Sequence, residues 1–330
     1  MQRREATPGV PSSTAEQPAK VEGANYEANV RRPYHPNAAL TISAVYRAIE
    51  LRAKTVGQFQ MQYQKLNREG GNYVPDMWGD GKRLNYLLQV QPNPFMNAYD
   101  MLYKITTHYF LYNNAFILIQ KDDAGEPIGL YPINASGVSF LNDQKGTLYC
   151  QFDFRNGKQM TFLYADLVHL RRHFNENDLL GDYNNAIMPT LELAHTQNEG
   201  MVNSIRSSAN IRGILKFTQI MAPEKLKEEK EQFISDYLSI SNDGGIVATD
   251  QKMEYTPIEV TPASIDEKQL GAVQKKIYDY LGISEGIVNS TYTENEWAAF
   301  YESVLEPFAT QLSMEFTRKL FTERERAFGN

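Results

Sequence analysis

A helix followed by a β-hairpin is the feature that most constrains the fold, and two closely spaced prolines mark where it begins. Pro92 and Pro94 exclude a helix at that point, and Asn97 then stands where a helix N-cap belongs. Apolar residues recur behind it at near-helical spacing, at positions 101, 102, 105, 109 and 111. This pattern predicts a helix of about four turns.

The residues after this helix predict the hairpin. Asn113 and Asn114 end the helix, and the run 115–120 is typical of a short strand. A polar turn at 122–125 separates it from a second apolar run at 128–131. The region therefore combines α and β structure.

This segment resembles the corresponding part of bacteriophage portal proteins of the HK97-like family. The resemblance rests on Pro92-Asn93-Pro94, Asn114-Ala115 and Leu130-Tyr131-Pro132. It extends in the family's order to AVYRAIELRAKTVGQFQMQYQK (44–65), ADLVHLRR (165–172) and the arrangement of 182–322. Roughly Thr41 to Glu325 is covered. No single string is decisive, but several in register over that length favour the family.

The resemblance implies an α+β portal-type subunit that forms a ring, dodecameric in the family, at one capsid vertex. Double-stranded DNA enters and leaves the head through such a ring. The implied partners are further copies of the chain, the terminase large subunit, a head-completion or adaptor protein, and the major capsid protein or a scaffold. The implied location is the portal vertex of the virion, with the bacterial host cytoplasm during assembly.

Composition agrees with a large protein of this kind. With 330 residues the chain exceeds the usual size of a single core, so two or more structural regions are expected. No run approaches the roughly 20 apolar residues of a membrane span, and the N-terminus lacks the apolar region of a signal peptide. We therefore expect no membrane partner. The lone Cys150 is predicted to be a small buried side chain in a reducing compartment.

The first half is predicted to be a mixed α/β region behind a disordered tail. Residues 1–37 hold few large apolar groups, so they cannot offset their ordering entropy by burial. One helix face is marked by Val45, Ile49, Arg52 and Val56. The alternation at Phe59, Met61 and Tyr63 that follows predicts a strand. A Gly-rich loop is expected at 73–82. Alternating β segments are expected at 137–168, with a tight turn at Asn156-Gly157.

The second half predicts helix, strand, helix, strand, helix. The first helix runs to about Asn210 with Pro189 in its first turn, and Pro223 opens a charged helix. Strands are expected at 214–217 and 246–249. A third helix starts at Thr261-Pro262 and ends at the C-cap Gly282.

A polar stretch, 283–292, then precedes a capping box formed by Thr293 and Glu296. The helix that begins there carries one apolar face for nearly thirty residues and should kink at Pro307. Its face consists of Trp297, Tyr301, Val304, Leu305, Phe308, Leu312, Phe316 and Leu320.

With the resemblance, these patterns divide the chain into a disordered tail (1–37), an α/β wing (38–182), a first stem helix (183–210), a clip (211–260), a second stem helix (261–283), a tunnel loop (284–295) and a long kinked wing helix with a short C-terminal end (296–330). The C-terminal crown common in the family is expected to be very short or truncated.

Charge is distributed unevenly along the chain. Residues 277–317 contain seven acids and no Lys or Arg. The whole chain has 40 acids and 33 bases, so the remainder balances at 33 of each. An acidic constriction repeated around a ring would repel phosphates and keep DNA from adhering during transit.

Candidate functional residues follow from this charge pattern and from the resemblance. The predicted channel loop residues are Glu285, Asn289, Thr291, Glu294 and Asn295. The predicted channel-facing stem residues are Lys268, Lys275 and Asp279. The predicted clip residues for terminase or adaptor docking are Glu224, Lys227, Glu228 and Glu231. Ordinary solvation of a helix face is the competing interpretation for the clip charges and for Glu302, Glu306 and Glu315.

Two other functions remain open: a cytosolic α/β enzyme using Asp166 or Glu199 with His173, and a monomeric DNA-binding protein. Residues 79–83, GDGKR, do not form a phosphate-binding loop, and no Ser or acid beside His195 marks a catalytic triad. The i, i+4 pair His169 and His173 follows a strand-like run, where it cannot share a metal as it would on a helix. We therefore predict no catalytic residues, metal or cofactor.

Overall fold

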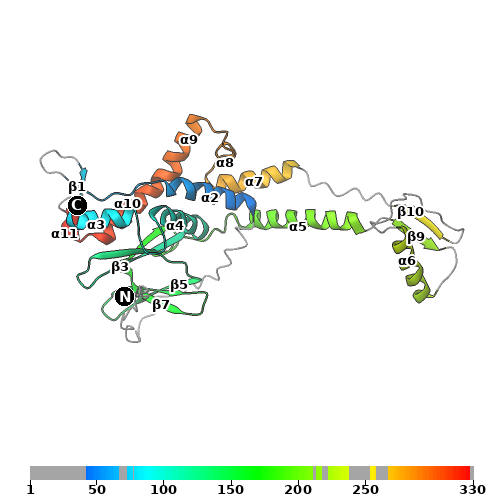
Figure 1. Ribbon diagram of the computed structural model, residues 1–330, viewed down its shortest axis with the longest axis horizontal. Coiled ribbons are helices and arrows are strands. Elements are labelled where there is room, and N and C mark those ends of the chain that lie inside the picture. Colours follow the sequence, from blue (N-terminus) through cyan, green and yellow to red (C-terminus); the bar gives the residue numbers. More distant parts are fainter. Residues whose placement is uncertain are drawn as a thin grey trace, which may run out of the picture. The chain divides into compact units, whose positions relative to one another are not determined.

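Two units make up the described part of the chain (Figure 1). This computed structural model describes residues 42–66, 73–76, 78–210, 213–217, 222–237, 253–257 and 267–327. The first unit is formed by the chain up to Asn184 and from Leu281 onward, and the second by Asn185–Tyr280. The predicted disordered tail, 1–37, lies outside the described residues.

Two helices form the α layer of the first unit. In α2 (Ser43–Gly57) the apolar residues at 45, 48, 49, 53 and 56 are buried, and the helix packs against α4 (Ala98–Tyr112). The side chain of Asn97 accepts the Asp100 N–H at 2.8 Å and caps α4. Asn113 ends α4 in the left-handed region, with φ at 55°. Both predicted helices are confirmed.

The central sheet has the order β4-β3-β8 and is antiparallel throughout. It contains β3 (Asn114–Lys121), β4 (Pro127–Pro132) and β8 (Leu167–Arg171). The predicted hairpin is β3–β4, with an irregularity between Gln120 and Lys121. The strand β3 lies between two partners, and its first four residues are all buried, so side chains on both of its faces are covered there.

A second antiparallel sheet has the order β5-β6-β7. Its strands are β5 (Gly137–Asn142), β6 (Leu148–Asp153) and β7 (Gln159–Leu163), followed by the 3-10 turn η1 (Tyr164–Asp166). Gly157 adopts φ 77° in the turn between β6 and β7, which confirms the tight turn predicted there.

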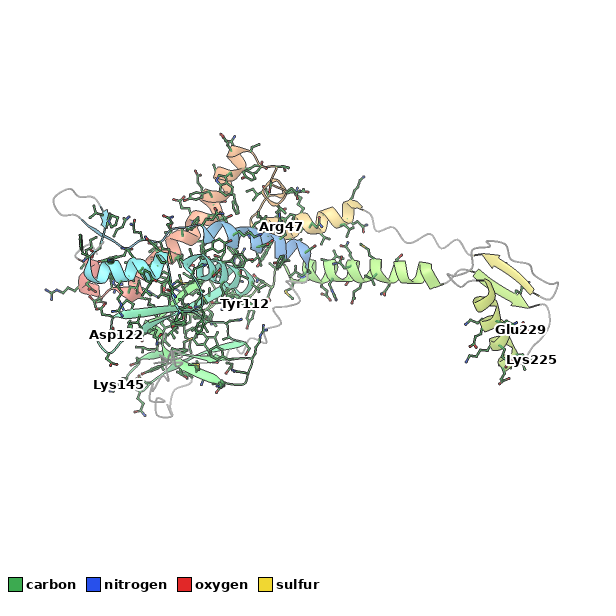
Figure 2. All side chains as sticks on the ribbon, viewed as in Figure 1. Arg47, Tyr112, Asp122, Lys145, Lys225 and Glu229 are labelled. Atoms are coloured by element: carbon green, nitrogen blue, oxygen red, sulfur yellow. The ribbon has the colours of Figure 1, made fainter. Side chains whose placement is uncertain are left out.

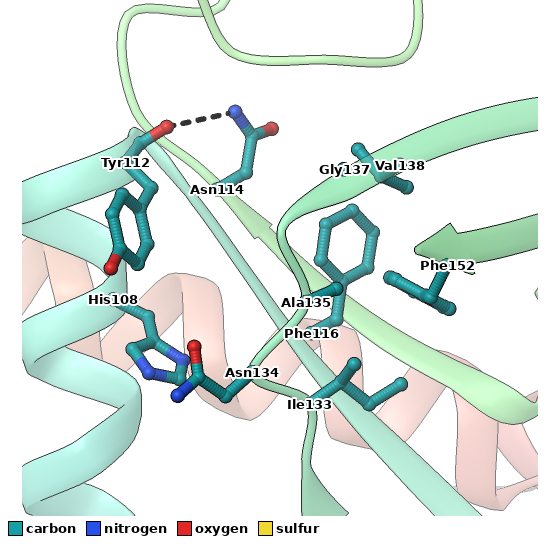
Figure 3. Close-up of a pocket in the computed structure, with 10 residues that line it drawn as sticks. All are labelled: His108, Tyr112, Asn114, Phe116, Ile133, Asn134, Ala135, Gly137, Val138 and Phe152. Carbon is teal, nitrogen blue, oxygen red and sulfur yellow. Dashed lines mark hydrogen bonds between the residues drawn. The ribbon is translucent and has the colours of Figure 1, made fainter. Parts of the chain in front are cut away.

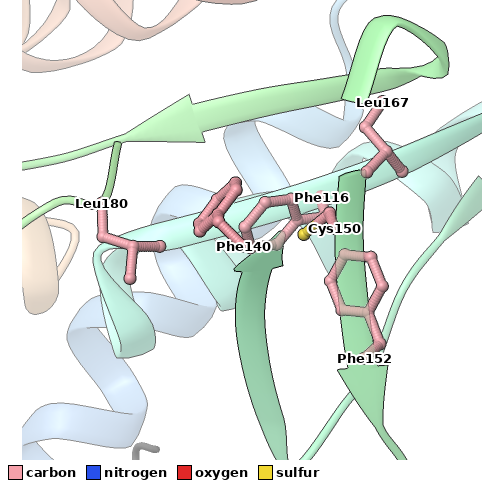
Figure 4. Close-up of a cluster of buried hydrophobic side chains, with 6 residues drawn as sticks. All are labelled: Phe116, Phe140, Cys150, Phe152, Leu167 and Leu180. Atoms are coloured by element: carbon pink, nitrogen blue, oxygen red, sulfur yellow. The ribbon is translucent and has the colours of Figure 1, made fainter. Parts of the chain in front are cut away.

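Side chains of both sheets form the apolar cluster of Figure 4. The cluster consists of Phe116, Phe140, Cys150, Phe152, Leu167 and Leu180. Cys150 is completely buried, as predicted, and burial raises the pKa of its thiol well above the usual value. The thiol therefore behaves as a small apolar side chain.

Two predictions for 59–82 are wrong. Residues 59–63 are not a strand: β1 is Gln64–Leu66, and it pairs with β2 (Tyr73–Pro75) inside the predicted loop. The helix α3 (Gly79–Gln89) also begins within that loop. Leu84, Leu87 and Leu88 are buried at helical spacing. The side chain of Asn85 in α3 accepts the Tyr63 N–H at 2.6 Å. The backbone N–H of Tyr63 is therefore bound by a side chain and not by a neighbouring strand.

The C-terminal part of the first unit is helical. It contains α8 (Glu285–Val288), α9 (Glu294–Phe300), the π-helical turn η2 (Tyr301–Leu305), α10 (Glu306–Leu320) and α11 (Glu323–Ala327). The predicted long helix is thus present from 294 to 320, but it is interrupted directly before Pro307 by η2. Leu305, Phe308, Leu312 and Phe316 are buried as expected, whereas Trp297 and Tyr301 are 36% and 43% exposed.

The second unit contains α5 (Met188–Asn210), β9 (Gly213–Phe217), α6 (Pro223–Tyr237), β10 (Met253–Pro257) and all but the last residue of α7 (Glu267–Leu281). The antiparallel partner of β9 is β10. The strand predicted at 246–249 and the helix start at Thr261-Pro262 lie outside the described residues. Gly282 follows α7 at φ 67°, which confirms the predicted C-cap. Among the described helices, none has the length and apolar character needed to cross a membrane.

Candidate functional site

The predicted channel loop, 284–295, contains a short anchored helix. Ser284 accepts the Ile287 N–H at 3.3 Å and caps α8. Ile287 and Val288 are buried, as is Ile283 directly before the helix. The expectation of a polar stretch at 283–292 is therefore wrong in part, because these three apolar side chains hold the segment against the first unit.

The second half of the loop is shaped by hydrogen bonds that lead into α9. Thr291 N–H donates to the Gly286 carbonyl at 2.8 Å. The capping box is confirmed: Thr293 N–H donates to Glu296 Oε2 at 2.8 Å, and Glu296 N–H donates to Thr293 Oγ1 at 3.3 Å. A Cβ on Gly286 would lie 3.0 Å from Glu296 Oε1, so α8 and the start of α9 are in direct contact.

The five loop residues singled out from the sequence are all exposed; they are Glu285, Asn289, Thr291, Glu294 and Asn295. In the same segment, the rings of Tyr292 and Trp297 lie close together, with centroids 5.5 Å apart. Within the described ranges, Glu285 and Glu294 form no ion pair with a basic side chain. The segment therefore presents uncompensated negative charge to solvent.

The remaining acids of this segment have different surroundings. Glu302 and Glu306 are exposed on η2 and the first turn of α10. Glu315 is half-buried and accepts a hydrogen bond from Arg318 at 3.0 Å. The Glu296 carboxylate is used by the capping box. Only part of the negative charge is therefore available to a ligand or partner.

The candidate residues of the second unit are also exposed. On α7 they are Lys268, Lys275 and Asp279, while Val273 and Ile277 on the same helix are buried. On α6 they are Glu224, Lys227, Glu228 and Glu231. Figure 2 shows two of their neighbours on α6, Lys225 and Glu229. Roles in a channel or in docking remain predictions for these residues.

His169 has a structural role, as the strand-like sequence before it indicates. It lies in β8 and is 1% exposed. Its Nδ1 is 3.2 Å from the Tyr164 hydroxyl and its Nε2 is 3.1 Å from Asn114 Oδ1. The ring also stacks on Phe116 with centroids 4.0 Å apart. Both ring nitrogens are thus occupied by the fold.

The groups considered for an enzyme have ordinary partners. Asp166 Oδ1 lies 2.6 Å from Lys121 Nζ, and Glu199 lies 3.4 Å from His195 one turn earlier on α5. His173 is exposed at φ 53°. In the described part of the chain, no three His, Cys, Asp or Glu side chains are grouped so that they could hold a metal ion.

A pocket that the sequence did not predict lies between α4 and the start of β5 (Figure 3). It is lined by His108, Tyr112, Asn114, Phe116, Ile133, Asn134, Ala135, Gly137, Val138 and Phe152. Burial, with a smaller effect of Lys104, lowers the pKa of His108 to about 4, and burial raises the pKa of Tyr112 to about 12. Both groups are neutral at pH 7, so the pocket offers hydrogen bonds and aromatic surface rather than charge.

Comparison with known proteins decides the family. The model of the family described as "Phage portal protein" matches residues 43–329, nearly the whole chain. The chain belongs to the phage portal protein family. Probable portal proteins of Lactococcus phages p2 and SK1 are each 21% identical over 191 residues, which cover 54% of this chain and 47% of the relative. The chain therefore spans about half the length of the curated relatives it matches.

Solved structures share the portal fold. A chain from the virion of a native gene transfer agent particle matches with a TM-score of 0.64 at 14% identity, covering 88% of this chain and 81% of that one. A chain from the neck of that particle type, computed with C12 symmetry, has a TM-score of 0.64 at 14% identity and covers 86% and 78%. An HK97 family portal protein from Corynebacterium diphtheriae has a TM-score of 0.51 at 12% identity, covering 87% and 91%.

Proposed function

We propose that this chain is the subunit of a phage portal, a ring at one capsid vertex through which double-stranded DNA is packaged and ejected. The observation that carries the proposal is the family match over residues 43–329. Further support comes from the C12 symmetry of the gene transfer agent neck that contains a chain of the same fold. We propose a homo-oligomeric ring of twelve copies, located in the virion and assembled in the host cytoplasm.

Each region has a proposed part in this ring. Residues 38–182 form the wing, 183–210 the first stem helix, 211–260 the clip and 261–283 the second stem helix. Residues 284–295 form the tunnel loop, and 296–330 form the long kinked wing helix with a short C-terminal end. The terminase large subunit and a head-completion or adaptor protein dock at the clip, and the capsid protein or a scaffold surrounds the ring.

The proposed role is a passive conduit, with a separate motor performing the work. The exposed carboxylates of Glu285 and Glu294 support this role, because negative charge in a narrow channel repels the phosphate backbone. A protein that binds DNA tightly places Lys and Arg on its contact surface instead. Residues 277–317 contain none.

Reversing the loop charge tests this proposal. The variant Glu285→Lys/Glu294→Lys should slow or stall DNA packaging and ejection in phage assembled with it, since a ring of Lys attracts phosphates strongly. Asp123→Lys/Asp178→Lys is the matched control, because it changes the net charge equally at exposed positions outside the loop. Unchanged packaging and ejection in the loop variant would contradict the assignment of these residues to the channel.

A further inference from the structure

Arg52 of α2 is buried in the first unit without a partner for its charge. Its side chain is completely inaccessible, and Nε, Nη1 and Nη2 form no hydrogen bond with any described residue. The guanidinium carbon lies 4.5 Å from the Phe110 ring centroid and 5.9 Å from that of Phe300. Burial, together with the nearby charge of Arg172, lowers the pKa of Arg52 to about 9, so the group is still a cation at neutral pH. An unpaired buried cation is costly, and aromatic faces compensate it only in part.

The helix that covers Arg52 carries an irregularity at the adjoining residues. In η2 the Glu306 N–H bonds to the Tyr301 carbonyl five residues earlier, so this turn holds one residue more than an α-helical turn. The extra residue changes which side chains of α9 face the core. Phe300 is 5% exposed, whereas Tyr301, which an uninterrupted helix would place on the buried face, is 43% exposed.

The unpaired charge of Arg52 and the π-helical turn η2 can be explained together. We propose that α9 has a second register, in which the π-helical turn has moved to the N-terminal end of α9 and Tyr301 replaces Phe300 above Arg52. The aromatic ring over the guanidinium is retained in that register. The Tyr301 hydroxyl supplies the hydrogen-bond acceptor that Arg52 lacks in the present one.

The sequence is compatible with both registers. In the present one Phe300 is buried, and in the second the expected face Trp297, Tyr301, Val304 and Phe308 is continuous. Moving the extra residue rotates α9 by about 100° and shifts it by about 1.5 Å along its axis. Because Glu296 contacts Gly286, the shift is transmitted to α8 and to the exposed acids of the loop. The proposed change of register takes place within one subunit and does not depend on the proposed function.

Fluorine NMR of the full chain tests the second register. Trp78 is 84% exposed, so Trp78→Phe leaves 5-fluorotryptophan at Trp297 as the only label with little expected disturbance. Phe300→Leu weakens the ring contact with Arg52 in the present register only. A second resonance should then grow about tenfold relative to the first.

Two further changes identify that resonance. Tyr301→Phe removes the hydroxyl, and Arg52→Met removes the cation; each, added to Phe300→Leu, should reduce the second resonance about tenfold. Tyr73→Phe is the control for loss of an exposed tyrosine hydroxyl, because Tyr73 is 62% exposed on β2, away from the label, and it should leave the ratio of the two resonances unchanged. A single resonance in Phe300→Leu, or a second one unaffected by Tyr301→Phe and Arg52→Met, would overturn the proposal.

Discussion

Asn114 is predicted to be the polar residue on which the stability of the first unit depends most. It is 7% exposed at the start of β3. Its Oδ1 accepts the Gly181 N–H at 2.9 Å and lies 3.1 Å from His169 Nε2. Its Nδ2 donates to the carbonyls of Tyr112 at 3.1 Å and Gly181 at 3.3 Å. The Asn114 side chain therefore connects the end of α4 and the strands β3 and β8 to the segment around Gly181.

The substitution Asn114→Ala removes the hydrogen bonds that Asn114 Oδ1 makes with the Gly181 N–H and with His169 Nε2. Each unsatisfied buried donor costs about 1–3 kcal/mol, while a carbonyl that loses one bond costs less. We expect the free energy of unfolding of the first unit to fall by about 3 kcal/mol. That is a large part of the roughly 5–15 kcal/mol of a typical domain.

Urea unfolding followed by circular dichroism measures this loss. Asn134→Ala is the matched control, because Asn134 lines the same pocket but is exposed. Its effect should stay within about 0.5 kcal/mol. A loss below about 1 kcal/mol for Asn114→Ala, or equal losses for the two variants, would refute the reasoning.

Three more predictions concern packing and titration. Gly181→Ala should abolish folding of the first unit, because a Cβ there would collide with the carbonyl oxygens of Arg172 and Asn113. The control Gly200→Ala on α5 places its Cβ in open space and should be neutral or mildly stabilising. Thermal unfolding of the two variants measures the difference. The free energy of unfolding should fall as the pH drops from about 6.5 to 4. In this range His108 is protonated in the unfolded chain, whereas in the folded chain its pKa is about 4. The unfolding midpoints of His108→Leu should lack this part of the pH dependence. Cys150 should react with a thiol reagent only after denaturation, because its side chain is buried and burial raises the pKa of its thiol. Rapid labelling of the native chain would contradict the burial of Cys150.

The elements that could be predicted from the sequence are those with local signals. The cap at Asn97 and the capping box at Thr293 each act within three residues, so their hydrogen bonds can be anticipated from spacing alone. The turn at Gly157 and the C-cap at Gly282 are equally local. The pattern of apolar residues likewise indicated α2, α4 and the β3–β4 hairpin.

What could not be predicted depends on contacts between distant segments. The helix α3 begins in a Gly-rich run that resembles a loop, and only the burial of Leu84 and its neighbours makes it a helix. Arg52 was expected on a helix face but not as an unpaired buried cation. The extra residue in η2 has no local signal besides Pro307, and it decides whether Phe300 or Tyr301 is buried.

For the candidate site, the sequence indicated the acidic segment and its exposed residues but not how they are held. Nothing in the polar stretch 283–292 suggested that Ile283, Ile287 and Val288 anchor it as α8. A run of four residues is too short for helical periodicity to be recognised. The pocket lined by His108 was missed because its walls come from separate parts of the chain.

The central claim is that this chain forms a ring around a DNA channel, and the mass and shape of the purified protein test it most directly. Native mass spectrometry should find an assembly of about 450 kDa, since twelve copies of a 37.7 kDa chain are expected. Negative-stain images should show rings with a central hole wide enough for duplex DNA. A protein that remains monomeric at every concentration, and binds duplex DNA with a tight, salt-dependent affinity, would contradict the account.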